Sequence, residues 1–126
     1  MSYQLSLRSM SRLKGVHTDL VLVVSRAIQL SKYDFGVLEG LRSEERQRKL
    51  YNTGKSQTMK SKHLVGLAVD LVAYDKNGHV TWDMYYYRKI NMSMQQAAEE
   101  LGVTITWGGD WISFQDGPHW QLEIGN

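Results

Sequence analysis

The sequence predicts an α+β fold in which a small antiparallel sheet packs against about three helices. Three observations lead to this class: segments with apolar residues at helical spacing, short segments rich in β-branched residues, and an Asn-Gly pair between two of the latter. The chain has 126 residues and no repeat or proline-rich linker, so we expect residues 1–126 to form a single domain.

The first part of the chain is expected to form a helix, a strand and a second helix. Apolar residues recur at three- and four-residue steps over residues 11–31, which predicts one amphipathic helix. Residues 33–41 alternate in the manner of a strand. Ser43 precedes two glutamates and suits the N-cap of a helix over residues 43–52, because acidic groups are favourable in a first turn.

The central part is expected to form a loop and a hairpin. Residues 55–62 are polar and typical of a loop, and residues 68–74 are apolar and β-branched, which predicts a strand. The Asn-Gly pair at 77–78 is a strong hairpin signal and leads into a further strand over residues 80–82.

The last part is expected to form a helix and two strands. Residues 85–101 have helical spacing, and Gly102 suits the C-cap. Strands are expected at residues 103–106 and 120–124, with a loop over residues 107–111. Helices and hairpin-linked strands in this order favour an α+β class with an antiparallel sheet.

Composition excludes several kinds of site. The chain has no cysteine, so any metal must be held by His, Asp or Glu, and neither a disulfide nor a thiol nucleophile is possible. Its apolar runs are far shorter than the roughly 20 residues that span a bilayer. The N-terminus lacks the basic-then-apolar plan of a secretory signal, so we expect no signal peptide and no membrane insertion.

Charge is unevenly distributed along the chain. Residues 42–62 carry seven basic and two acidic side chains, whereas residues 63–126 carry three basic and eight acidic ones. A basic segment can mark nucleic acid or an anionic polymer as a partner, or it can be a solvated helix face. The nearly balanced total charge and the lack of a recognisable binding module argue against nucleic acid.

One candidate cluster lies in the segment Ser-Lys-His-Leu-Val-Gly-Leu-Ala-Val-Asp. It places His63 in a loop and Asp70 on the strand that follows, and Gly66 allows a sharp turn between them. A carboxylate with apolar neighbours is costly unless a cation or hydrogen bonds compensate it. The alternative is an exposed aspartate on an edge strand. His17 and His79 are expected to be structural or surface residues.

A second candidate cluster is Asp-Gly-Pro-His at residues 116–119. The Gly-Pro turn can hold His119 rigidly at the start of a strand, with Asp116 on the turn before it. Two histidines and a carboxylate are the ligand count of a catalytic zinc site, and a second carboxylate can serve as its general base. Alternatively, Asp116 only caps the turn.

The pattern Ser-x-His-x-x-Gly-x-Ala-x-Asp at residues 61–70, followed by Asp-x-x-His at 116–119, resembles a known family. It is similar to the zinc peptidases of the D-Ala-D-Ala carboxypeptidase and L-alanyl-D-glutamate peptidase group, which have a lysostaphin-type, hedgehog-like fold. Within that group the likeness is to small phage endolysins. It covers nearly the whole chain, including residues 15–20, 39–43 and 107–111.

The resemblance implies a zinc peptidase domain that hydrolyses the L-alanyl-D-glutamate bond of peptidoglycan. His63, Asp70 and His119 would hold one Zn²⁺ ion. Asp116 falls where the family has its catalytic carboxylate, which is Glu in many members. Arg42 falls where relatives place an arginine near the substrate carbonyl, and its alternative role is a surface ion pair with Glu39 or Glu44.

Weaker candidates surround these residues. Ser61 is expected to hydrogen-bond the substrate or to stabilise a turn, and Asp110 to bind a substrate amine or to satisfy the Gly-Gly turn. Four aromatic residues are expected either to wall a substrate groove or to lie in the core. They are Tyr74, Trp107, Trp111 and Trp120.

Other functions stay open at this point. A D-Ala-D-Ala carboxypeptidase or dipeptidase would use the same metal site, because a motif does not encode which bond is cut. A non-catalytic cell-wall-binding module is the alternative from another class. The resemblance otherwise implies a monomer that acts on peptidoglycan and waits in the host cytoplasm until a holin releases it to the periplasm.

Overall fold

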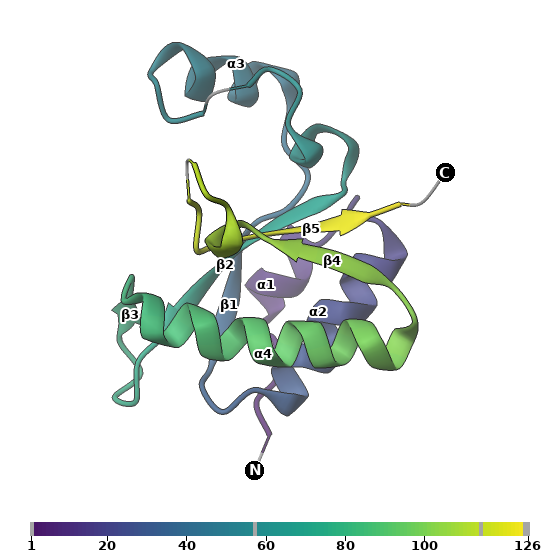
Figure 1. The fold of residues 1–126 in the computed structure, drawn as a ribbon, viewed down its shortest axis with the longest axis vertical. Helices are drawn as coiled ribbons and strands as arrows, with labels where there is room; N and C mark the ends of the chain where they lie inside the picture. Colours follow the sequence, from purple (N-terminus) through teal and green to yellow (C-terminus); the bar gives the residue numbers. More distant parts are fainter. Residues whose placement is uncertain (1, 57, 114, 125–126) are drawn as a thin grey trace.

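An antiparallel sheet separates two layers in the computed structural model, which describes residues 2–56, 58–113 and 115–124 (Figure 1). Helices α2 (Thr18–Leu30) and α4 (Met84–Leu101) pack against each other and cover one face of the sheet. Helix α1 (Leu7–Arg12) lies beside the first strand. Helix α3 (Glu44–Asn52) lies with its loops on the other side of the sheet.

The sheet has the strand order β1-β2-β5-β4, and β3 pairs with β2 outside this path. Every pairing is antiparallel. The strands are β1 (Phe35–Glu39), β2 (Ala68–Tyr74), β3 (Val80–Thr81), β4 (Thr104–Trp107) and β5 (His119–Glu123). Strands β2 and β5 therefore lie inside the sheet, with a neighbour on each side.

Alternate residues of these inner strands face the helices. Val69, Leu71 and Ala73 of β2 and Trp120 and Leu122 of β5 are buried in the hydrophobic core. Successive side chains of a strand point to opposite faces, so the residues between them point away from the core. One face of the sheet is thus covered by α2 and α4, and the other face is free to carry polar groups.

The predicted fold class and all five predicted strands are confirmed, with strand ends that shift by at most two residues. The predicted helices over residues 43–52 and 85–101 are also present. The Ser43 hydroxyl accepts the backbone N–H of Arg46 at the start of α3, and Gly102 ends α4 in the left-handed conformation.

The single helix predicted over residues 11–31 is wrong. The described residues contain α1 up to Arg12, a turn, and then α2 from Thr18, so the α-helices number four instead of about three. Gly15 lies in the turn at φ +86°, and the His17 side chain caps α2 by accepting the Asp19 N–H. The apolar spacing continues across the break because Leu13 and Val16 of the turn are buried in the core, and this conceals the break in the sequence.

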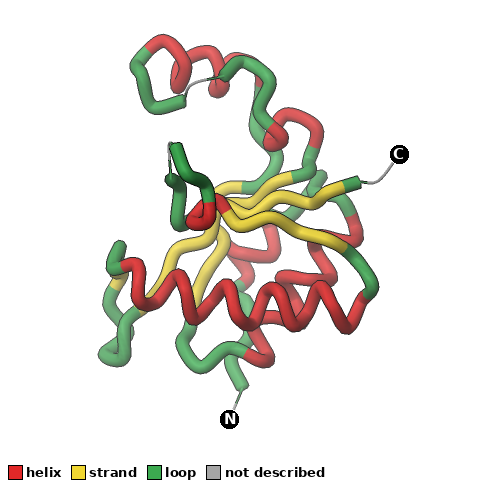
Figure 2. Tube along the Cα trace, viewed as in Figure 1, coloured by secondary structure: helices red, strands yellow, loops and turns green. Residues whose placement is uncertain are grey.

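Two short 3₁₀ turns interrupt the expected loops. They are η1 (Lys62–Val65), directly before β2, and η2 (Gly108–Asp110), directly after β4 (Figure 2). No helix in the described part of the chain combines the length and apolar character that a membrane crossing requires.

Gly66 is expected to be essential for the stability of the turn between η1 and β2. It has φ +73°, and a Cβ at this position would collide with the backbone carbonyl oxygen of Gly15. We expect Gly66→Ala to lower the free energy of unfolding by at least ~1–2 kcal/mol in a urea titration. Gly54→Ala is the matched control, because Gly54 has φ +77° with open space around its Cβ. Equal losses in both variants would contradict the collision.

Candidate metal centre

The centre begins with a row of polar residues across three neighbouring strands. Asp70 of β2 pairs with His119 of β5 on one side and with Glu39 of β1 on the other. Directly opposed residues share a face of the sheet, so all three point away from the core. A register shift between Val37 and Glu39 turns Glu39 to this face. The alternative of an exposed aspartate on an edge strand is wrong, because β2 has a neighbour on each side.

His63 reaches the same place from η1. The Ser61 hydroxyl caps this turn by accepting the backbone N–H of His63, and Gly66 ends it in the left-handed conformation. The His63 side chain is 2% exposed. Its backbone carbonyl accepts the N–H of Arg42, which fixes the turn against the segment after β1. The turn therefore delivers a rigidly held imidazole to the polar face of the sheet.

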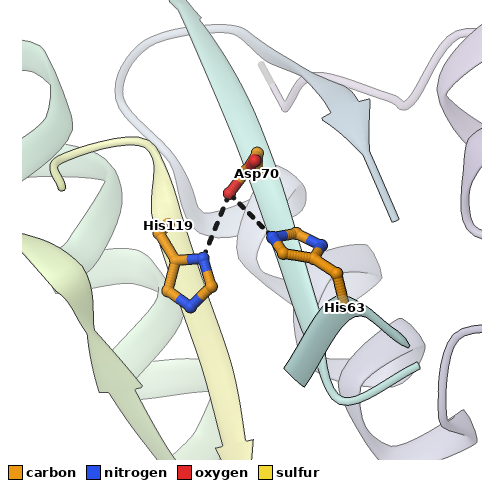
Figure 3. A group of neighbouring side chains, drawn as sticks. All are labelled: His63, Asp70 and His119. Carbon is orange, nitrogen blue, oxygen red and sulfur yellow. Dashed lines mark hydrogen bonds and ion pairs between the residues drawn. The ribbon is translucent and has the colours of Figure 1, made fainter. Parts of the chain in front are cut away.

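The two imidazoles and the Asp70 carboxylate converge (Figure 3). His63 Nε2 and His119 Nδ1 each lie 3.2 Å from Asp70 Oδ1. One ligand atom from each of the three residues lies within 4.8 Å of the others. Ligands around a tetrahedral zinc ion are separated by about 3.4 Å, as bonds of roughly 2.0–2.1 Å require. The arrangement is thus close to the size of a zinc site.

The outer ring nitrogens are already hydrogen-bonded. His63 Nδ1 lies 2.8 Å from the carbonyl oxygen of Gly40, and His119 Nε2 lies 3.0 Å from Gln121 Oε1. Because both partners are acceptors, these nitrogens donate. Each inner nitrogen then either carries a second proton, which it donates to Asp70, or presents a lone pair to it. In both cases positive charge must lie between the rings and the carboxylate, as protons on the imidazoles or as a cation. The donor set therefore fits a divalent cation.

The electrostatics of the pair Asp70 and His119 agree with this requirement. Burial alone would raise the pKa of Asp70, but hydrogen bonds from His119 and His63 outweigh it and hold the pKa well below its ordinary value. Burial would lower the pKa of His119, but the Asp70 carboxylate outweighs it and raises the pKa. The site thus keeps a carboxylate anion and attracts positive charge.

Arg42 is buried and held on several sides. Its guanidinium donates from Nε and Nη2 to the two carboxylate oxygens of Glu39, at 2.7 and 3.1 Å, and from Nη1 to Gln47 at 2.7 Å. Nη2 also lies 3.4 Å from Asp70 Oδ2. The expected alternative of a surface ion pair is wrong in one respect: the Glu39 pair exists, but Arg42 is only 9% exposed. Glu44 pairs instead with Arg48.

Gln47 is a structural partner of the site that sequence reasoning missed. It is the one residue of α3 that is buried. Its Oε1 accepts from Arg42, and its Nε2 donates to the Ser56 hydroxyl and to the carbonyl oxygen of Thr58. Gln47 therefore connects the arginine beside Asp70 to the loop after α3. In the sequence it is one polar residue among others on a polar helix, with no distinguishing signal.

Truncating Gln47 is expected to loosen this connection. Gln47→Ala leaves a buried N–H of Arg42 without its acceptor and removes one of the two donors to the Thr58 carbonyl, which costs about 1–3 kcal/mol of unfolding free energy. Arg48→Ala, on the exposed side of the same helix, is expected to cost less than ~0.5 kcal/mol. Urea unfolding of both variants checks this. A Gln47→Ala protein as stable as the control would show that the connection is energetically unimportant.

Asp116 lies on the turn before β5 and lines the same pocket as the cluster. Its backbone N–H donates to the carbonyl oxygen of Gly108 at 2.9 Å, and a Cβ on Gly108 would collide with the Asp116 carbonyl. Within the described residues no hydrogen bond holds its side chain, so the turn-capping alternative finds no support. Burial, and then the negative charge of Asp70, raise the pKa of Asp116, which suits a group that accepts a proton.

A pocket of about 530 Å³ brings most of the predicted residues together. It contains the cluster with Arg42, Ser61, Asp116 and also Trp111, whose ring centroid is 5.1 Å from that of His119. Asp110 is exposed and lies outside this pocket, so its expected contact with a substrate amine is not supported.

For Trp107 and Trp120 the core alternative holds and the groove role does not. Both are buried in the core, at 5% and 0% exposure, with stacked rings. Their indole N–H groups donate to the Gly117 carbonyl and to Asn91 Oδ1. Trp120 follows His119 in β5, and neighbouring residues of a strand face opposite sides, so only one of the two can face the site. Tyr74 does not line the pocket either.

The chain is similar to proteins that are named L-alanyl-D-glutamate peptidases or endopeptidases. A family model described as phage L-alanyl-D-glutamate peptidase matches residues 1–123. The L-alanyl-D-glutamate peptidase of Escherichia phage T5 is 33% identical over 120 residues, which cover 92% of this chain and 87% of that protein. The peptidoglycan L-alanyl-D-glutamate endopeptidase CwlK of Bacillus subtilis is 33% identical over 103 residues, 71% of this chain and 60% of CwlK. The crystal structure of the L-Ala D-Glu endopeptidase ChiX of Serratia marcescens matches with a TM-score of 0.91 and 45% identity, covering 97% of this chain and 91% of that one.

Proposed function

Because this chain belongs to the phage L-alanyl-D-glutamate peptidase family, we propose that it is a zinc endopeptidase of peptidoglycan that cuts the bond between L-alanine and D-glutamate. The observation that carries the zinc proposal is the convergence of His63, Asp70 and His119, with Asp116 lining the same pocket. Two neutral imidazoles and one carboxylate are a donor set that zinc prefers, and they leave a fourth position open.

A zinc ion in this set supplies a Lewis acid that activates water for attack on a carbonyl. The residues of the chain supply the proton transfers and the orientation. Asp116 accepts a proton from the attacking water and delivers it to the leaving amine as the C–N bond breaks. The products are a peptide that ends in the L-alanine carboxylate and one that begins with the amine of D-glutamate.

Arg42 supplies fixed positive charge at the wall of the same pocket. Its three nitrogens donate to Glu39, Gln47 and Asp70, which leaves one of its five N–H groups, on Nη1, without an acceptor among the residues that the structure describes. That group and the guanidinium charge can stabilise the carbonyl oxygen as negative charge develops on it. Release to the periplasm by a holin remains part of this proposal.

Digestion of purified peptidoglycan tests the proposal. The zinc-loaded protein is expected to release fragments with a new N-terminal D-glutamate, detected by mass spectrometry of the peptides. Release of free D-alanine instead would favour the carboxypeptidase alternative. Intact stem peptides after incubation with folded, zinc-loaded protein would contradict both enzymes.

A further inference from the structure

Basic side chains gather on one wall of the pocket. Arg46 of α3, Lys55 and Lys60 of the following loop, and Lys62 of η1 all line it. We call these four residues the basic wall. Trp111 and Asp116, which precede β5, and His119 and Gln121 of β5 also line the pocket. The pocket is therefore lined by one basic segment and by a second segment whose one charged side chain there is the Asp116 carboxylate.

Much of the positive charge of the basic wall is not neutralised by ion pairs between described residues. Glu39 is already held by two hydrogen bonds from Arg42, and Arg46 Nε lies 3.9 Å away from it. Lys62 Nζ lies 4.0 Å from Glu123. Between described residues, no ion pair reaches Lys55 or Lys60. Positive charge is thus left over at the pocket, where it can act on a ligand.

The same helix also carries basic residues that do not face this pocket. Arg48 and Lys49 are neighbours of Arg46 in α3, but neither lines the pocket, and Arg48 pairs with Glu44 at 3.5 Å. The basic segment 42–62 therefore has two sides: one faces the candidate metal centre and one faces solvent. Substitutions on one side or the other can therefore distinguish binding of a ligand inside the pocket from general electrostatic attraction to the basic segment.

The substrate in the proposed function brings a matching negative charge. Glutamate has two carboxyl groups, and continuation of the peptide uses only one of them. Whichever carboxyl is used, the residue after the cut retains a free carboxylate close to the reacting carbonyl. An anion at that distance from the cluster can reach the walls of a pocket of this size.

Resting on the proposed function, we propose that the basic wall binds the free carboxylate of the residue that follows the scissile bond. The pocket thereby selects an acidic residue at this position and disfavours its amide. Charge-assisted hydrogen bonds of Arg and Lys to a carboxylate are about twice as strong as neutral ones. We expect a roughly tenfold preference in kcat/KM for glutamate over glutamine at this position, weakened by added salt.

Two synthetic peptides that differ only in this carboxylate or carboxamide provide the test. The wild-type chain is compared with Arg46→Gln/Lys60→Gln and with Arg48→Gln/Lys49→Gln, which removes the same charge from the solvent side. Thermal unfolding establishes that each variant is folded. The first variant is expected to lose most of the preference, and the second to keep it.

Equal cleavage of both peptides by the wild type would overturn the inference. So would an equal loss of preference in both variants, which would indicate general attraction to the basic segment. Calorimetric binding of the fragment that begins with D-glutamate, against its D-glutamine counterpart, separates this inference from the proposed function. A carboxylate preference in binding, lost only in the pocket variant, supports the basic wall even if neither peptide is cut. Equal binding of the two fragments overturns it.

Discussion

Replacing Asp70 with asparagine is expected to abolish metal binding and reduce kcat/KM by at least ~10³-fold. Asp70 is the one anion of the His-Asp-His set, and its Oδ1 lies 3.2 Å from both inner ring nitrogens. Asparagine keeps the size but removes the charge that offsets a divalent cation. Substitution of residues that merely orient metal ligands commonly costs 10–100-fold in affinity, so loss of a ligand is expected to cost more.

Metal analysis after dialysis, together with the rate of peptide cleavage, measures this effect. His79→Ala is the matched control, because it removes an exposed imidazole in a turn outside the pocket. A chelator is expected to lower the melting temperature of the wild type and of the control, but not that of Asp70→Asn, since a ligand of the folded state stabilises it. An Asp70→Asn protein that retains one zinc ion per chain would contradict the assigned centre.

Part of this centre could be predicted from local sequence alone. His63 and Asp70 lie seven residues apart, and the glycine between them has the positive φ that a sharp turn requires. His119 is 49 residues beyond Asp70, and only the pairing of β2 with β5 brings them together. Spacing along the chain contains no information on that pairing, so the third residue of the cluster depended on the family resemblance.

The alternation of side chains along a strand decides between the two roles that the sequence left open for Trp120. A groove role is incompatible with His119 facing the site, because consecutive residues of a strand cannot share a face. Applying the period of two to residues 119–123 would have placed Trp120 and Leu122 in the core, where they are found. The break at Gly15 is different, because Leu13 and Val16 of the turn occupy the apolar positions that a continuous helix would also have.

Other residues of the site lie beyond any local pattern. Glu39 faces the cluster because the register of β1 shifts after Val37, and a register shift depends on the partner strand. Gln47 is buried because Arg42 and the Thr58 carbonyl meet its amide. Both positions are set by tertiary contacts, so a single sequence cannot distinguish them from neighbouring polar residues.

Replacing Asp116 with asparagine is expected to lower kcat by about 10²–10⁴-fold while zinc binding stays unchanged. The side chain lines the pocket beside the cluster but is not one of the three converging ligands, so its removal affects proton transfer and leaves the donor set intact. Burial and the charge of Asp70 raise its pKa, which an amide cannot reproduce because it accepts no proton.

A matched control separates this role from a general effect of charge. Asp110→Asn removes the same charge from an exposed position at the end of η2, outside the pocket. It is expected to leave kcat within about twofold of the wild-type value. Asp116→Glu retains a carboxylate and is expected to keep far more activity than the asparagine variant. Single-turnover kinetics and metal content of all three proteins decide the matter. If Asp116→Asn kept the wild-type kcat, another group would have to accept the proton, whereas loss of zinc with loss of activity would make Asp116 part of the metal site.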